Sequence, residues 1–328
     1  MNFRTTINVD PSPLKITYGD NTMFIGSCFA ATMGEQMQIC KMPVIINPAG
    51  TVYNPVSVLN TLGNLISGKI TGRDDLYNHE GTWLSFFHYT DFSSEDPESL
   101  IEKINNCTVK AGEFLRKSRF LFITLGTARV YRLKKTGIIV SNCHKVPSAQ
   151  FEPELLTVND IVDQWESLLG SLSEFNPDLK VVFTVSPVRH WKDGAHGNQV
   201  SKFVLFLAIQ ELLKHKSIPG YFPAYELLID DLRDYRFYSD DMLHPSLSAV
   251  EYIWKKFSGA YFDTETVNLQ NEILKIVRAC NHRFITDSLF KKKAFAEIML
   301  KQISEIQTRN NLIDFTVERD YFLNLIGI

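Results

Sequence analysis

The chain has 328 residues, of which 45% are hydrophobic and 22% charged, and its net charge is −3. This composition is typical of a globular protein with one large domain or two ordinary ones, and the lack of a basic excess argues against nucleic-acid binding. The five cysteines are widely spaced and form no CxxC pair, which argues against a structural zinc site and against a disulfide framework.

The first residues lack the apolar core of a secretion signal. No uncharged stretch approaches the length that spans a membrane. We therefore expect a cytoplasmic protein without a membrane span.

Five apolar runs have the length and composition of buried strands, and they cover residues 23–25, 44–46, 120–125, 181–185 and 225–229. Helical patterns separate them, at residues 31–40, 55–66, 98–117, 158–172 and 198–214. Strands that are apolar on both faces and alternate with amphipathic helices predict a buried parallel sheet. The expected fold class is therefore α/β, with helices on both faces of the sheet.

Three segments lie outside this alternation. Residues 67–94 are rich in glycine, aromatic and polar residues and predict an insertion or lid, whose aromatic side chains are interpreted as packing residues. Residues 131–140 predict a hairpin. After about residue 264 the pattern is helical. We predict an α/β domain over residues 1–264 and a helical extension over residues 265–328, which packs on that domain and could mediate self-association.

A carboxylate three residues before a histidine marks the segment from Asp241 to His244, which Pro245 follows. On a tight loop such a carboxylate can reach Nδ1 of the ring and fix the tautomer, so that Nε2 faces outward as a base. The simpler interpretation is an ordinary turn before a helix that starts near Ser246. The pair predicts a general base that needs a nucleophile from elsewhere in the chain.

Candidate nucleophiles stand at Ser27 and Cys28, where the first apolar strand ends at Gly26 and a helix begins. A hydroxyl or thiol at such a turn has the N–H groups of a helix end beside it. The alternative is a plain helix start, with Ser27 as the N-cap and Cys28 buried.

Polar or small residues also follow the other strands, at Gly126 and Thr127 and at Ser186. The carboxyl ends of parallel strands meet at one edge of the sheet, where such folds carry their sites. We expect these segments to converge with Gly26, although strand termination alone also explains them.

A polar loop follows the strand at 181–185. In it, Arg189 could bind a carboxylate or phosphate bidentately, and His190 is a second candidate substrate-binding residue. A metal site formed by His190, Asp193 and His196 is conceivable, but the spacing fits no strong ligand signature. We therefore expect neither a metal nor a cofactor.

Together these segments resemble the GSCFA family, whose signature stands at residues 26–30 as Gly-Ser-Cys-Phe-Ala. The resemblance also takes in residues 47–55, 124–128, 186–190 and the late pair of Asp241 and His244. That family is similar to a branch of the SGNH/GDSL hydrolase superfamily. The resemblance implies a three-layer, flavodoxin-like fold and acyl ester chemistry through a Ser-His-Asp arrangement.

Mapped onto this chain, the resemblance implies His244 as general base and Asp241 as the carboxylate that orients it. The superfamily binds the oxyanion with the N–H of the nucleophile, a glycine N–H and an asparagine side chain. Gly50 is the implied glycine donor, but the asparagine position holds Ala128. Asn54 or Asn47 could substitute. Loss of one such donor typically lowers the rate by roughly two to three orders of magnitude.

The register of the nucleophile also departs from the superfamily. An ungapped match to Gly-Asp-Ser places Cys28 at the nucleophile position, whereas a slip of one residue places Ser27 there. Both alternatives stay open at this point. The resemblance predicts a hydrolase of small-molecule or carbohydrate esters. An acyltransferase, or a non-catalytic binding module on the same scaffold, is the alternative.

Overall fold

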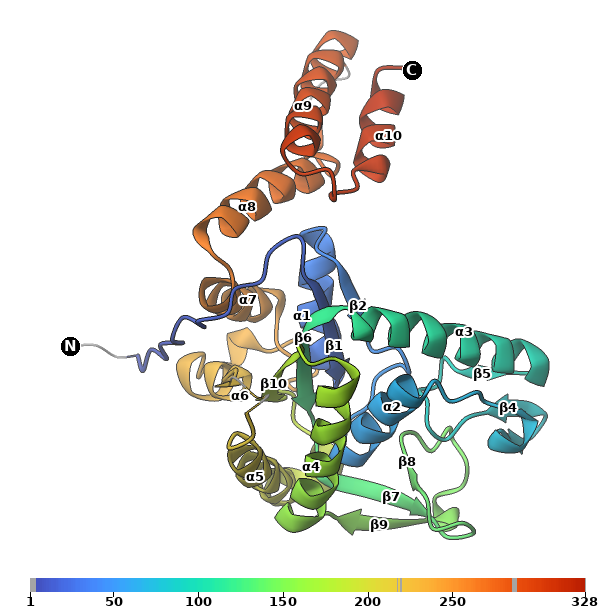
Figure 1. The fold of residues 1–328 in the computed structure, drawn as a ribbon. Helices are drawn as coiled ribbons and strands as arrows, with labels where there is room; N and C mark the ends of the chain where they lie inside the picture. The colour runs from blue at the N-terminus through green and yellow to red at the C-terminus, as the bar shows by residue number, and fades with distance from the viewer. Residues whose placement is uncertain (1–3, 217, 219, 285–287, 328) are drawn as a thin grey trace.

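The computed structural model describes residues 4–216, 218, 220–284 and 288–327 (Figure 1). Residues 1–3, 217 and 219 of the predicted domain, and 285–287 and 328 of the predicted extension, lie outside the described residues. The centre is a five-stranded sheet of the order β11-β10-β6-β1-β2, whose described strands all pair in parallel. These strands are β1 (Asn21–Gly26), β2 (Val44–Ile46), β6 (Ser118–Leu125), β10 (Lys180–Val185) and β11 (Gly220–Tyr221).

Counted along the chain, this order is the 2-1-3-4-5 arrangement of flavodoxin-like sheets. Such a sheet reverses its winding between its first strand and the third, here between β1 and β6, and ligands bind at the carboxyl ends of the strands near that point. The predicted three-layer α/β fold is confirmed. The topology also places the Gly26 turn at the expected binding edge.

Helices cover both faces of the sheet, as Figure 1 shows. Side chains alternate along each strand. Phe24 and Phe122 therefore belong to a core with α1 and α7, whereas Ile25 and Phe183 belong to a second core with the helices of the other face. The covering helices are α1 (Cys28–Ile39), α2 (Pro55–Ser67), α3 (Pro97–Arg116), α4 (Val158–Phe175), α5 (Gly194–Leu212) and α7 (Leu247–Tyr261).

The fifth predicted strand, at residues 225–229, is wrong. These residues form α6 (Ala224–Glu226) and a π-helical turn, η4 (Leu227–Asp231). Leu227 and Leu228 are fully buried in the core on the α1 face. A short apolar run suits a buried helical turn as well as a buried strand. The fifth strand is instead β11, whose two described residues give too short a run to detect.

The insertion at residues 67–94 holds the short helix η1 (Arg73–Asp75) and an antiparallel sheet of β3 (Tyr77–His79), β4 (Thr82–Leu84) and β5 (Ser93–Ser94). Phe86 is buried in this region, where its ring contacts those of Tyr77 and Phe151. Its side chain therefore serves packing.

The predicted hairpin is confirmed, because β7 (Arg129–Leu133) pairs antiparallel with β8 (Ile139–Val140). A strand that was not predicted, β9 (Phe151–Leu155), pairs with the other edge of β7 and follows the short helix η2 (Ser148–Gln150).

The C-terminal region consists of α8 (Thr264–Ala279), α9 (Leu289–Arg309) and α10 (Thr316–Leu325), which stand beside the α/β body in Figure 1. It contacts the C-terminal end of α1. The Nε2 atom of Gln270 donates to Sγ of Cys40 at 3.3 Å, and Lys41 pairs with Glu318 at 2.8 Å. Phe290 is 82% exposed on α9, and self-association through these helices stays a prediction. Within the described residues, no helix has the length and apolar character needed to cross a membrane.

Candidate active site

The turn from β1 into α1 depends on a glycine. Gly26 has φ of +133°, and a Cβ atom there would lie 2.1 Å from the carbonyl oxygen of Thr124 on β6. Only glycine combines that backbone conformation with so close an approach. Its N–H donates to Oδ1 of Asn47 at 2.8 Å, which ties the turn to the loop after β2.

Ser27 and Cys28 have different environments. Ser27 is 1% exposed and caps α1, since its Oγ accepts the N–H of Phe29 at 3.3 Å. Its own N–H donates to the carbonyl of Thr124 at 3.0 Å. Cys28 is the first residue of α1 and is half-buried. The hydroxyl therefore holds the end of the helix, and the thiol faces the site.

The loop that carries His244 is shaped by Asp241. Oδ1 of Asp241 accepts the N–H groups of Leu243 at 2.8 Å and His244 at 2.9 Å. Met242 has φ of +60°, and Ser239 N–H closes the turn on the carbonyl of His244 at 2.8 Å. α7 begins directly after this loop, with Ser246 as its N-cap, as predicted from the sequence.

Asp241, His244 and Cys28 form a continuous chain of contacts. Oδ2 of Asp241 lies 2.6 Å from Nδ1 of His244, and Nε2 of His244 lies 3.4 Å from Sγ of Cys28. An ionised carboxylate only accepts hydrogen bonds, so Nδ1 carries the proton and Nε2 presents its lone pair to the thiol. The backbone N–H groups of His244 and Leu243 hold the pKa of Asp241 at about 2, so this carboxylate stays charged near neutral pH.

Burial and nearby polar groups shift the pKa of Cys28 in opposite directions. Burial raises the pKa of the Cys28 thiol above its usual value. The N–H groups of Phe29 and Cys28 and the charge of Lys202 act in the other direction, and Asp241 adds to the rise. The balance raises the pKa of the thiol and favours its protonated form.

A cavity of about 280 Å³ surrounds the thiol. Its walls come from the carboxyl ends of β1, β6 and β10, the loop after β2 and the loop that carries His244. The predicted convergence of strand ends is confirmed. The lining residues are Ser27, Cys28, Tyr53, Gly126, Ser186, Val188, Arg189, His190 and His244.

Of the residues suggested for the oxyanion hole, Gly50 has its N–H engaged, whereas Asn47 and Asn54 are held through their side-chain oxygens. The Nδ2 donor of Asn47 has no partner among the described residues. Gly50 N–H donates to the carbonyl of Asn47 at 2.8 Å, and Asn47 itself accepts from Gly26. Asn54 caps α2, because its Oδ1 accepts the N–H of Ser57 at 2.8 Å. Among the described residues, those that line the cavity do not include Gly50, Asn47 or Asn54.

The strand end at Gly126 is part of the cavity, but its donors are occupied. The N–H groups of Gly126 and Thr127 both donate to the carbonyl of Tyr53, at 2.7 and 3.1 Å. The Thr127 hydroxyl lies 2.8 Å from Ser201 Oγ, which also accepts the N–H of Ala128 at 2.7 Å. The two bonds to the Tyr53 carbonyl hold the backbone of Tyr53 at the cavity wall, and the bonds to Ser201 hold the strand end itself.

Of the predicted substrate-binding residues, both Arg189 and His190 line the cavity. Burial lowers the pKa of His190. Asp193 lies 3.4 Å from Arg129 in an ion pair. Across the described residues, no group of three or more His, Cys, Asp or Glu side chains is arranged to hold a metal ion.

Sequence reasoning missed Lys202, which lies on α5 and is fully buried. Its Nζ donates to the carbonyl of Ser186 at 2.6 Å, and burial lowers its pKa to about 7. Lysine is almost never fully buried without a partner, so a lysine among the apolar positions of the 198–214 pattern was the available signal.

Tyr53 was also missed as an individual candidate, although it lies in the 47–55 block. Its pKa is raised, first by burial and then by Tyr89 and Cys28 nearby. A side-chain hydrogen bond with Tyr89 also raises this pKa, so the hydroxyl keeps its proton and is engaged with Tyr89.

A search of curated proteins finds no significant match to this chain. The sequence model of the GSCFA family matches residues 21–257, which run from the start of β1 into α7. This range contains every residue that lines the cavity around Cys28. Since the match covers well over half of the chain, the protein belongs to the GSCFA family.

Proposed function

We propose that the protein is an SGNH-type hydrolase of acyl esters that uses a cysteine as its nucleophile. The observation that carries this proposal is the chain of contacts from Asp241 through His244 to the thiol of Cys28. A nucleophile within reach of a base, and a base oriented by a third group, is the arrangement that acyl transfer needs. The buried, helix-capping position of Ser27 favours Cys28 as the nucleophile.

In the proposed reaction, Sγ of Cys28 attacks the ester carbonyl carbon while Nε2 of His244 takes the thiol proton. The tetrahedral intermediate collapses, the bond to the alkoxide breaks, and His244 returns the proton to the leaving oxygen. Water, deprotonated by His244, then attacks the thioester. The acid is released, and Cys28 recovers its proton. Asp241 holds the imidazole and stabilises its charged form throughout.

Two donors are proposed for the oxyanion. The N–H of Cys28 stands at the start of α1, where the first N–H groups of a helix have no partner within the helix. Tyr53 lines the same cavity, and its hydroxyl, which is hydrogen-bonded to Tyr89, stays protonated. Tyrosine hydroxyls serve as oxyanion donors in other sites. Tyr53 would thereby replace the asparagine that the superfamily places at the position of Ala128.

Lys202 is proposed as a positioning residue. Its Nζ holds the carbonyl of Ser186, which belongs to the cavity wall, and its charge favours the thiolate form of Cys28. The helix N–H groups act in the same direction as Lys202. These fixed charges favour the thiolate, and His244 is proposed to remove the thiol proton.

Hydrolysis is preferred over acyl transfer because the site is open. The side chains of His244 and Asp241 are each 47% exposed. The cavity lining, which lies wholly within the described chain, includes no residue of the 67–94 insertion. Water therefore has access to His244, the proposed base for hydrolysis of the thioester. Product analysis with and without a sugar acceptor distinguishes the two reactions, since a transferase yields an acylated acceptor.

The decisive experiment is intact-mass analysis after brief exposure to p-nitrophenyl acetate. We expect one added acetyl group on the wild type and on Ser27→Ala, and none on Cys28→Ala. Acetylation that survives in Cys28→Ala and disappears in Ser27→Ala would assign the serine instead. A folded protein in which neither Ser27 reacts with fluorophosphonate nor Cys28 with iodoacetamide would support the binding-module alternative.

A further inference from the structure

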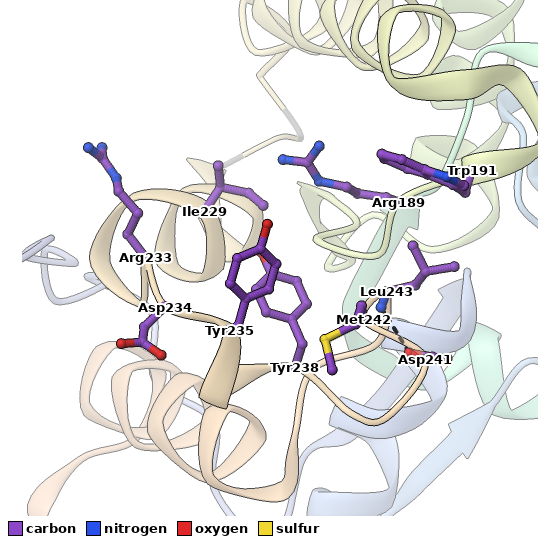
Figure 2. Close-up of a pocket in the computed structure, with 10 residues that line it drawn as sticks. All are labelled: Arg189, Trp191, Ile229, Arg233, Asp234, Tyr235, Tyr238, Asp241, Met242 and Leu243. Carbon is purple, nitrogen blue, oxygen red and sulfur yellow. Dashed lines mark hydrogen bonds between the residues drawn. The ribbon is translucent and has the colours of Figure 1, made fainter.

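A second hollow lies beside the reactive cavity and is larger, at about 570 Å³ (Figure 2). Arg189 lines both hollows, and so do residues of the loop that carries His244. The full lining is Arg189, Trp191, Ile229, Arg233, Asp234, Tyr235, Tyr238, Asp241, Met242 and Leu243. A molecule in this groove would therefore lie next to an ester held at Cys28. Its volume is in the range of small-molecule binding sites.

The charged groups of the groove leave one cation unpaired. Arg233 pairs with Asp230 at 3.0 Å. Asp234 accepts from the backbone of Arg236 and also pairs with its side chain. Asp241 is held by His244. No carboxylate of the described chain lies within ion-pairing distance of Arg189, whose guanidinium is free to bind an anion bidentately.

The floor of the groove is aromatic and exposed. Tyr235 is 79% and Trp191 51% exposed, and the ring centroids of Tyr235 and Tyr238 lie 6.3 Å apart. Figure 2 shows both tyrosine rings below Ile229, with the guanidinium groups of Arg233 and Arg189 on either side of it. Rings with an apolar face and a polar tip suit a ligand that is flat on one side and hydroxylated at its rim. A purely aliphatic chain would leave these polar tips and the Arg189 charge unpaired.

We infer that the groove binds the alcohol part of the substrate, and that this part is an acidic sugar. Its carboxylate or phosphate contacts Arg189, and its ring lies on Tyr235 and Tyr238. This assignment rests on the proposed function, because it identifies the occupant of the groove with the ester cleaved at Cys28. The anion is the feature that Arg189 selects, and a neutral sugar would lack that contact.

The test is ligand binding to Cys28→Ala, measured by calorimetry. The probes are glucuronate, glucose 1-phosphate and neutral glucose. We expect at least one anion to bind roughly ten- to hundredfold more tightly than glucose, as one charge-assisted contact allows. The tighter anion shows whether a carboxylate or a phosphate is preferred.

Arg189→Gln should abolish the preference for the anion and leave glucose binding unchanged. Arg73→Gln is the matched control, because Arg73 is an exposed arginine of η1 that is not among the residues lining the groove, and the preference should persist in it. Equal binding of the three probes, binding of none, or an anion preference that survives Arg189→Gln would overturn the inference.

The outcome is separable from that for the proposed function. Binding to Cys28→Ala requires no catalysis, whereas acetylation by p-nitrophenyl acetate requires no groove. Anion binding without acetylation would retain the groove and reject the hydrolase. Acetylation without anion selectivity would retain the hydrolase and reject the acidic sugar.

Discussion

Sγ of Cys28 lies 3.4 Å from Nε2 of His244, although 216 positions separate the two residues in the chain. Because burial raises the pKa of the thiol, its thiolate fraction at neutral pH is small without a base. We predict that alkylation of Cys28 by iodoacetamide at pH 7 is roughly two orders of magnitude slower in His244→Ala than in the wild type.

The pH dependence of this reaction follows from the same pKa. In His244→Ala the rate should climb as pH rises toward the raised pKa, because only the thiolate attacks. Peptide mapping after timed alkylation measures it, with Cys28→Ala showing the background from the other four thiols. Equal rates in wild type and His244→Ala at pH 7 would contradict the proposed role of the base.

Asp241 combines a structural and an electrostatic task, and the two can be separated. Asp241→Asn keeps an oxygen that can accept the N–H groups of Leu243 and His244, but it no longer holds a proton on Nδ1. We predict that ester turnover falls by up to about four orders of magnitude, the effect of a wrong imidazole tautomer, with little change in thermal stability. Asp240→Asn, on the preceding exposed residue, should leave turnover unchanged. Full activity in Asp241→Asn would reject the orienting role.

Tyr53→Phe tests the proposed oxyanion donor. Removal of the hydroxyl should lower the rate of acetylation by roughly two to three orders of magnitude, because the tetrahedral intermediate loses one donor. Alkylation by iodoacetamide passes through no oxyanion, so its rate should stay close to that of the wild type. The two rates are measured on the same preparation by intact mass. A parallel loss of both would indicate a packing role for Tyr53.

Lys202→Met tests the buried charge that lowers the pKa of the Cys28 thiol. The lysine has a pKa of about 7 in the folded protein, so its ammonium promotes thiolate formation mainly below that pH. We predict that the ratio of wild-type to Lys202→Met alkylation rates exceeds one at pH 6 and falls toward one at pH 9. Lys214→Met changes an exposed lysine beyond the end of α5. The ratio of wild-type to Lys214→Met alkylation rates should therefore stay at one at every pH.

Protein stability gives an independent readout for Lys202. Between pH 7 and the ordinary lysine pKa of 10.5, the unfolded chain binds a proton there that the folded protein has lost. The free energy of unfolding of the wild type should therefore rise with pH relative to Lys202→Met, by at most about 1.4 kcal/mol per pH unit. Denaturant titrations at several pH values measure this. A difference that is constant with pH would contradict the lowered pKa.

Gly26→Ala should disrupt both the fold and the site. The new Cβ would meet the Thr124 carbonyl at 2.1 Å, and φ of +133° is strained for alanine. We expect a loss of about 3 kcal/mol or more in the free energy of unfolding, together with loss of Cys28 labelling. Gly63→Ala is the matched control. It lies within α2 with open space around it, so the same change should stabilise by about 0.5–1 kcal/mol.

The parts of the fold that sequence predicts well are those with long, regular patterns. The run at 120–125 and the helix pattern at 158–172 lie within β6 and α4, because burial on both faces or on one stripe leaves a clear period. The strand predicted at residues 225–229 was wrong because a single buried helical turn is as apolar as a strand. β11 escaped because its described part, Gly220–Tyr221, is too short to have a period.

The site divides along a similar line. The sequence pointed to His244, Asp241, Ser27 and Cys28 as candidates because their spacing or position reflects local geometry, and the structure brings them together. The proposal of Cys28 over Ser27 rests on the direction of two side chains, which no periodicity encodes. Tyr53 and Lys202 approach the thiol from distant segments, so they emerge as candidates only when the strand ends are assembled.

The helix α1 carries the thiol at its first residue. At its other end, Cys40 and Lys41 contact Gln270 and Glu318 of the C-terminal helices. Twelve helical residues make a rod of about 18 Å. The contacts of the C-terminal helices and the thiol thus lie at opposite ends of one helix. A shift of α1 along its axis would change the distance between Sγ of Cys28 and Nε2 of His244.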